Sequence, residues 1–268
     1  MGKGKPFLEI FASALHEDYR FPILEIFTFL YTLGTFVFAS FSASMTQQVT
    51  SSESIAYSLT SSLLGLPLFI FIILIFKNVA YGFGSDLEKG IIQSYLSYPL
   101  KRHAILTAKL LSAIGVSLAL FLSIQISALY ILAPDIILPY LGTVLLTYTA
   151  TLSTSLFVAA IMLLVTLALR RGGLALVIGI VLYFAMGIIS SIVLFVAFAI
   201  DSPVPLQILS VISPNLALSR YYSINVPFGN EIWVPTFSEV LLYTGASYAI
   251  VAVLFALGYF YFSRRLGL

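Results

Sequence analysis

Six long apolar runs decide what this chain can fold into. Each run is about twenty residues or longer, which is enough for a helix to cross the roughly 30 Å hydrocarbon core of a bilayer. The composition agrees, with 60% hydrophobic and only 9% charged residues. We therefore expect an all-α polytopic membrane protein in which residues 1–268 form a single transmembrane domain. The six expected spans are residues 22–43, 55–77, 103–132, 139–169, 174–200 and 239–263.

The basic residues are distributed unevenly among the segments that connect these runs. Twelve of the thirteen Lys and Arg residues fall in the two terminal segments, in two of the loops or in the ends of the runs next to those loops, and only Arg220 falls elsewhere. Cytoplasmic loops of membrane proteins carry such an excess of basic residues. The asymmetry predicts a multi-pass protein of the cell membrane with both termini in the cytoplasm.

Two segments outside the runs are also expected to be helical. Residues 7–19 are amphipathic, which is typical of a helix lying in the membrane interface. Its apolar face would carry Phe7, Leu8, Phe11, Ala14 and Leu15, and its polar face Glu9, Ser13, Glu17 and Asp18. The extracytoplasmic segment 201–238 contains two short apolar pieces, at residues 206–212 and 216–222. We expect short helices there that dip into the outer leaflet.

The runs are nearly free of groups that could carry chemistry. Glu25 lies one turn into the first run, and no ionisable residue other than Tyr occupies the middle of any run. Pumps and proton-coupled carriers usually need such groups. The chain has no Cys, only two His residues, and no phosphate-binding Gly-x-x-x-x-Gly-Lys-Ser/Thr loop. We therefore expect no enzyme, no metal and no cofactor in this chain, and the net charge of +2 does not indicate nucleic acid.

The loop after the second run has an ordered pattern. It predicts a short amphipathic helix over residues 85–98 that begins with a Ser-x-x-Glu capping box and ends before a proline. The apolar side of this helix would carry Leu87, Ile91, Tyr95 and Tyr98. The cap residues are Ser85 and Glu88, with Asp86 also near the helix N-terminus; Pro99 ends the helix, and Lys101, Arg102 and Lys109 follow. The alternative is a connector that merely lies on the lipid surface.

This segment resembles the cytoplasmic signature of the type-2 ABC exporter permeases. That signature has an acidic residue, a glycine, apolar residues up to a proline, basic residues, and a lysine at the start of the third span. The matching positions here are Glu88, Gly90, Leu96, Pro99, Lys101, Arg102 and Lys109. The segment Ala14–Pro22 is similar to the elbow helix of that family, which would occupy residues 1–21. The segment Ile212–Tyr222 is similar to its Ser-Pro segment before the last span.

The resemblance implies a dimer of permease chains, two copies or a copy and a homologue, working with separate ATP-binding subunits. ATP and Mg²⁺ would be bound by those partners. The 85–98 helix would be the coupling helix that docks on the ATPase. Its contact residues would be Ser85, Asp86, Glu88, Gly90, Tyr95, Pro99, Lys101 and Arg102. By the same analogy, the dimer seam and substrate path would involve Tyr31, Gly65, Tyr183 and Met186.

A stripe of hydroxyl residues recurs every four positions along the fourth run. Its members are Thr143, Thr147, Thr151 and Ser155. Such residues allow helices to pack closely, which we favour over a substrate lining. A path without charges favours lipid-like or amphipathic cargo. Two other functions stay open: a membrane scaffold or assembly factor that binds a cytoplasmic partner through the 85–98 helix, and an ATP-independent carrier.

Overall fold

The computed structural model describes residues 5–45, 52–96, 101–222 and 232–264, and its regular structure in this part of the chain is entirely helical. Five helices there are long and apolar enough to cross a membrane. They are Ser52–Glu88, Arg102–Leu132, Leu141–Leu169, Gly172–Ala199 and Phe237–Arg264. A sixth span results if the bent pair Pro6–Asp18 and Ile23–Val37 counts as one. The prediction of an all-α chain with five or six helices long and apolar enough to span a membrane is confirmed for the described residues.

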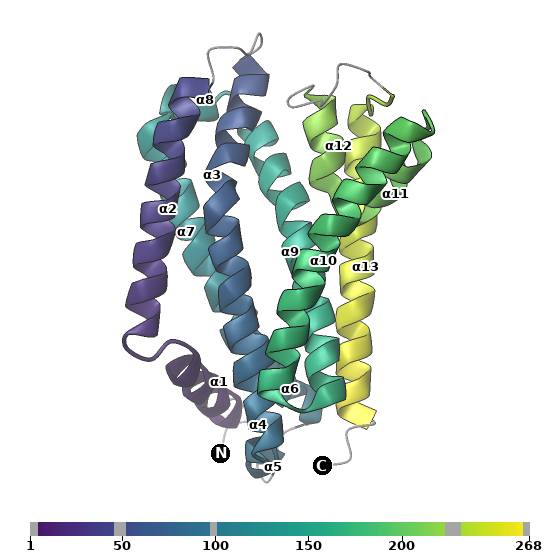
Figure 1. The fold of residues 1–268 in the computed structure, drawn as a ribbon. Coiled ribbons are helices and arrows are strands. Elements are labelled where there is room, and N and C mark those ends of the chain that lie inside the picture. The colour runs from purple at the N-terminus through teal and green to yellow at the C-terminus, as the bar shows by residue number, and fades with distance from the viewer. Residues whose placement is uncertain (1–4, 46–51, 97–100, 223–231, 265–268) are drawn as a thin grey trace.

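The helices follow one another in the order shown in Figure 1. The first half comprises α1 (Lys5–Asp18), α2 (Ile23–Met45), α3 (Ser52–Ile75), the π-helical η2 (Phe76–Phe83), α4 (Gly84–Glu88) and α5 (Ile91–Leu96). Next come α6 (Arg102–Leu110), the π-helical η3 (Leu111–Val116), α7 (Ser117–Leu132) and α8 (Pro134–Ile137). The second half comprises α9 (Leu141–Leu169), α10 (Gly172–Ala199), α11 (Val204–Ile212), α12 (Pro214–Tyr221) and α13 (Phe237–Arg264).

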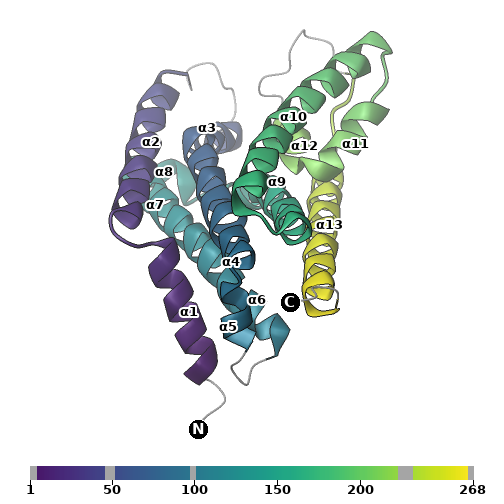
Figure 2. The ribbon, with the colours of Figure 1, turned by 60° about the horizontal axis from the view of Figure 1, so that its bottom comes forward.

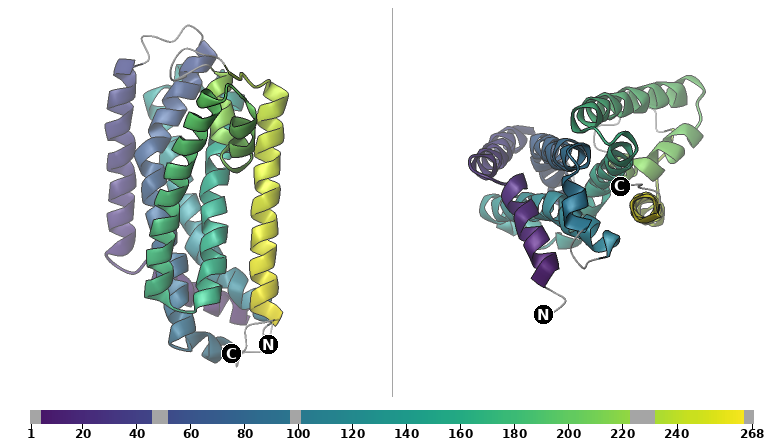
Figure 3. Two further views of the ribbon diagram at one scale, coloured as in Figure 1. Left: turned by 45° about the vertical axis from the view of Figure 1, so that its right-hand side comes forward. Right: turned by 90° about the horizontal axis from the view of Figure 1, so that it is seen from below.

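The long helices form a bundle with α3 and α9 at its centre. Helices α2 and α7 pack against α3, while α13 and α10 pack against α9 (Figure 1). Helices α1, α4, α5 and α6 gather at one end of the bundle, near the last residues of α13, and we call this the basal end (Figures 1 and 2). Helices α8, α11 and α12 lie at the opposite end (Figure 3).

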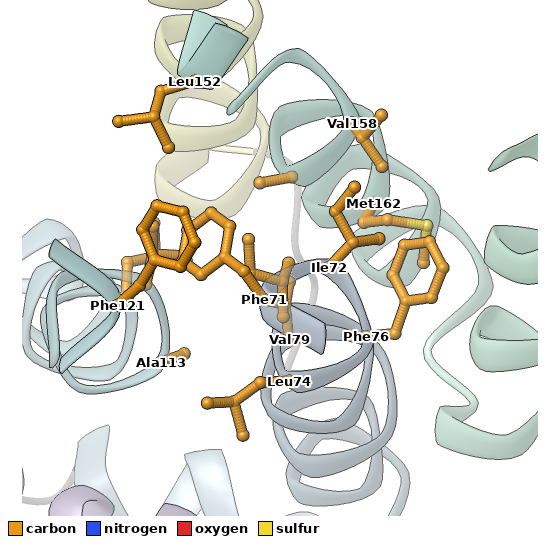
Figure 4. Packing of buried hydrophobic residues seen from close by; sticks show 14 of the residues in the cluster. Phe71, Ile72, Leu74, Phe76, Val79, Ala113, Phe121, Leu152, Val158 and Met162 are labelled. Atoms are coloured by element: carbon orange, nitrogen blue, oxygen red, sulfur yellow. The ribbon is translucent and has the colours of Figure 1, made fainter. Parts of the chain in front are cut away.

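The core joins α3, α7 and α9 through aromatic and aliphatic side chains (Figure 4). The rings of Phe71 and Phe121 stack with their centroids 5.3 Å apart, and Tyr31 meets Phe121 edge-on at 5.9 Å. Ile72 and Met162 extend the same cluster between α3 and α9. Lipid tails are as apolar as these side chains, so close van der Waals packing, rather than exclusion from water, holds such a core together.

The second long helix is longer than the expected span 55–77, because it continues through η2 and α4 to Glu88. Two polar residues at and just beyond the expected end of the apolar run form hydrogen bonds to the segment at the end of α1, so the helix continues. Lys77 Nζ donates to the backbone oxygen of Asp18 at 2.6 Å, and Asn78 Nδ2 donates to Tyr19 Oη at 3.2 Å. Helices α9, α10 and α13 begin and end within two residues of the apolar runs 139–169, 174–200 and 239–263.

Helix α1 buries a face slightly different from the expected one. Ile10 and Ala14 are buried, whereas Leu8, placed on the apolar face by the periodicity, is 61% exposed. Asp18 was expected on the polar face but is only 7% exposed. The buried face is therefore rotated toward Ile10, where it meets Ile105 and Ala108 of α6. A carboxylate thus enters the interior at the end of α1.

Two glycines allow two helices to come into close contact at the basal end. A Cβ atom on Gly84 of α4 would lie 2.8 Å from the Cα of Gly172, the first residue of α10. A Cβ on Gly172 would lie 2.7 Å from the backbone oxygen of Tyr81 and 2.8 Å from the nitrogen of Ser85. Small residues of this kind let helix backbones approach each other in membranes. The contact joins the end of the second long helix to the start of α10.

We expect Gly172→Ala to destabilise the protein and Gly173→Ala to leave it unchanged or slightly more stable. Alanine normally favours a helix over glycine by about 1 kcal/mol. At Gly172 the new methyl would meet backbone atoms that cannot rotate away, and such overpacking costs about 1–3 kcal/mol. A Cβ at Gly173 meets nothing within 4 Å. Thermal unfolding of both variants in detergent measures the difference, and equal midpoints would contradict the contact.

Candidate functional site

The short helix α5 lies at the basal extreme of the described bundle (Figures 1 and 2). It follows a sharp reversal at Gly90, whose φ of +72° is a left-handed conformation that favours glycine. Ile92 is fully buried, whereas the side chains of Lys89 and Gln93 are exposed. Tyr95 and Leu96 pack against α1 and α6. The helix is thus held on one side and presents polar residues on the other.

The expected helix over residues 85–98 is wrong in its boundaries. Ser85 lies inside a continuous helix, because α4 extends η2 without a break and its N-cap, Phe83, is itself helical and makes no side-chain cap. The reversal at Gly90 then divides the segment into α4 and α5. Gly90 therefore does not lie within a helix, and alanine there would be strained rather than stabilising. Tyr98 and Pro99 lie outside the described residues.

Glu88 caps a different helix from the one its sequence pattern predicts. Its Oε2 accepts a hydrogen bond from the backbone nitrogen of Gly172 at 3.2 Å. That nitrogen is at the start of α10, where the helix dipole also favours a negative charge. Together with the contact of Gly84 and Gly172, this bond fixes the α4–α10 junction.

A buried ion pair ties three helices together beside α5. Lys109 Nζ lies 2.5 Å from Asp86 Oδ2 and 3.1 Å from Glu17 Oε2. The side chains of Lys109 and Asp86 are 6% and 2% exposed, whereas that of Glu17 is 48% exposed. The ammonium group also lies 5.3 Å from the ring centre of Tyr95 on α5. The cluster therefore links α1, α4, α5 and α6 through one cation.

A second polar network joins the end of α1 to the two π-helical segments. Tyr19 Oη lies 2.7 Å from Ser117 Oγ and accepts from Asn78 Nδ2. Ser112 Oγ donates to Asp18 Oδ2 at 2.6 Å. Burial raises the pKa of Asp18, on α1 outside the long helices, from 3.8 to about 6, although the bond from Ser112 acts in the opposite direction. Ionisation of Asp18 as the pH rises through this range therefore costs folding free energy.

The structure brings part of the expected docking set together. Asp86, Glu88, Gly90 and Tyr95 lie around the α4–α5 reversal, with Ser85 one turn before it. Lys101 is exposed and Arg102 half-buried at the start of α6. Asp86 is buried in its ion pair, whereas Glu88 is exposed even though it bonds to Gly172, and it shares the exposed surface of this region with Lys89 and Gln93.

The expected pathway residues are scattered. Tyr31 is fully buried in the core, and Gly65 is exposed on the surface of α3. Thr147 and Thr151 are buried along α9, as are Thr143 and Ser155 of the same stripe. Tyr183 and Met186 both line a cavity beside α10. Of these eight residues, only Tyr183 and Met186 therefore line the same cavity.

Sequence reasoning missed a buried polar group in the middle of the bundle. Gln125 of α7 is fully buried, donates to Thr35 Oγ1 at 2.7 Å and accepts from Tyr148 Oη at 3.2 Å. The sequence did contain a signal, because Gln125 is a single amide side chain within an otherwise apolar run. Lys109 gave a similar signal, since it is a lone charge inside the apolar run 103–132. In neither case does the sequence alone identify the partner.

Within the residues that the structure describes, no three His, Cys, Asp or Glu side chains gather as a possible metal site. At the basal end, the short helix α5 lies beside a buried ion pair that connects α1, α4 and α6. No family model matches this chain, and no curated protein matches it in sequence.

We expect Lys109→Met to destabilise the protein strongly, because it leaves the Asp86 carboxylate buried without its cation. Removing one partner of a buried ion pair costs about 3–5 kcal/mol. Glu17→Gln should cost about 1 kcal/mol or less, since the Glu17 carboxylate is half exposed. The double variant Asp86→Asn/Lys109→Met should recover part of the loss. Thermal unfolding in detergent tests this order, and a Lys109→Met variant as stable as Glu17→Gln would refute it.

Proposed function

We propose that this chain is the membrane-spanning permease subunit of an ATP-driven transporter of the ABC exporter type. It would act as a dimer, with ATP hydrolysed by separate subunits docked at the basal end. The observation that carries the proposal is α5, a short exposed helix that is joined to long helices through buried contacts. The sequence resemblance to the type-2 ABC exporter permeases supports the same assignment.

A docked partner could act on the bundle through these contacts. Helix α5 continues from α4, α4 contacts α10 through Gly84 and Gly172, and Asp86 is paired with Lys109 of α6. Force applied at α5 would therefore reach the second, third and fifth spans together. Rigid-body movement of packed helices is one of the recognised ways in which a local event produces a global transition.

The interior favours a lipid-like or amphipathic cargo, as the scarcity of charge in the runs indicated. Ion-coupled carriers place ionisable groups within their spans. The buried polar residues at mid-depth in the described bundle are instead neutral, as in the group formed by Thr35, Gln125 and Tyr148. An ATP-independent carrier is therefore the less favoured alternative. A scaffold that binds a cytoplasmic partner through α5 would use the same surface, and the partner's identity distinguishes the two.

The orientation can be tested with single cysteines, because the chain has none of its own. We expect Asp135→Cys to react with a membrane-impermeant thiol reagent added outside intact cells, and Gln93→Cys and Arg171→Cys to react only after permeabilisation. All three positions are exposed in the structure. Labelling of Gln93→Cys from outside would place α5 on the extracytoplasmic side, where no ATPase could dock, and would refute the proposal.

Docking can be tested with charge changes at exposed positions that leave the internal contacts intact. We expect Lys89→Glu and Gln93→Arg to lose most of an ATPase that copurifies with the wild-type chain from native membranes. Glu9→Lys, an exposed charge reversal on α1, is the matched control and should retain the ATPase. Glu88 and Gly90 are unsuitable, since one caps α10 and the other holds a left-handed conformation.

Three results would count against the proposal. An ATPase retained equally by all three variants would show that α5 is not the docking element. A copurifying partner without ATPase activity, lost from Lys89→Glu and Gln93→Arg, would favour the scaffold. ATP hydrolysis by the purified chain alone would exclude the division of labour between subunits.

A further inference from the structure

A cavity of about 520 Å³ lies between α9, α10 and the end of α11. Its walls include Val158 and Met162 of α9, Tyr183 and Met186 of α10, and Leu209 of α11. Its size falls within the range of about 300–1,000 Å³ that is typical of pockets for small ligands. Val158 and Met162 also border the core, as Figure 4 shows, so one wall of the cavity is well packed from behind.

The cavity offers almost no polar partner to a ligand. Two of its hydroxyl groups are engaged with backbone oxygens: Thr154 Oγ1 donates to Ile212 at 3.4 Å, and Ser190 Oγ donates to Met186 at 2.8 Å. No carboxylate, ammonium or guanidinium group lines it. A polar or charged ligand would lose its hydration there without compensation. The chemistry of the walls therefore selects an apolar ligand.

Two glycines of α10 line the cavity, and the open space lies at the second of them, Gly187. At Gly179 a Cβ would collide with the end of the Met162 side chain, so the absence of a side chain lets Met162 lie across the helix. At Gly187 a Cβ would meet no atom within 4 Å. Glycine is among the weakest helix formers, and alanine would favour the helix by about 1 kcal/mol. The space beside α10 is thus maintained by residues that do not otherwise benefit the helix.

The position of the cavity determines where its ligand comes from. Thr154 to Met162 occupy the middle of α9, and Gly179 to Ser190 the middle of α10. Only four of the 28 residues of α10 are buried, namely Gly172, Ala175, Gly179 and Ala197, whereas α9 buries more than half of its residues. The cavity therefore lies at hydrocarbon depth beside a helix with little internal cover, where lipid tails are the surrounding medium.

We propose that this cavity binds the alkyl chain of a membrane lipid, inserted between α9 and α10 beneath the end of α11. The alkyl chain matches the apolar walls, the hydrocarbon depth and the open space at Gly187. The inference goes beyond the transport function proposed above, because it concerns what this chain binds by itself and needs no ATPase partner.

The test is photolabelling of the full chain in bilayers that contain a phosphatidylcholine with a diazirine in the middle of one acyl chain. After irradiation, mass spectrometry maps the labelled peptides. We expect several-fold more adducts on residues 154–162 and 179–190 than on the lipid-facing surface of α13. Gly187→Leu should reduce the cavity adducts several-fold, and Gly187→Ala should reduce them less while adding only one methyl group.

Gly245→Leu is the matched control, because Gly245 is an exposed glycine of α13 whose Cβ would also meet nothing within 4 Å. It should label like the wild type. Even labelling along all lipid-facing helices, or unchanged cavity adducts in Gly187→Leu, would overturn the inference by showing surface lipid only. Because the ATPase is absent from this experiment, a negative result leaves the transport proposal standing, and failed copurification of an ATPase leaves the lipid site standing.

Discussion

The arrangement of the basal end depends on how one buried ammonium group is neutralised. Lys109 could not remain charged among apolar helices without the carboxylate of Asp86 at its side. Glu17 and the ring of Tyr95 complete its surroundings, so groups from α1, α4 and α5 converge on a residue of α6. The four helices are therefore fixed relative to one another by a requirement of charge balance, and the exposed side of α5 is positioned as a result.

The remainder of the bundle is held by contact rather than by charge. In a lipid environment apolar side chains gain little from leaving the solvent, so helices must fit one another closely. The hydroxyl stripe of α9 illustrates this: Thr147 donates to the backbone of Thr143 and presents a small, nearly apolar surface to its neighbours. Gly84 and Gly172 achieve the same closeness by having no side chain at all.

The sequence was sufficient for the features that one segment determines alone. Long apolar runs become long helices whatever surrounds them, and the Pro-rich piece between the last two runs contains α11 and α12, as its short apolar stretches indicated. It was insufficient wherever a polar group has a distant partner. The second span was expected to end at Lys77, yet α1 and the residue after it supply partners for Lys77 and Asn78, and the helix continues.

The predicted capping box shows, over only four residues, that the sequence does not identify the partner of a polar side chain. Ser85 and Glu88 have the spacing of a local cap, but the helix is already formed before Ser85, so Glu88 is free to serve α10. The site residues could thus be located along the chain, while the bonds they make could not. Only the packing of α4 against α10 determines which backbone nitrogen Glu88 meets.

Helix α10 is in close contact with α4 at Gly172, whereas most of its other residues are not buried by the rest of the protein. A small rotation about Gly172 would therefore move its far end the most. Its 28 residues extend about 42 Å at 1.5 Å per residue. A tilt of about 5° around the glycine contact would then displace its far end by roughly 4 Å. Helix α9 lies in the core, so this displacement would be relative to α9. A small rotation at one end of the molecule would thereby widen or narrow the space between α9 and α10.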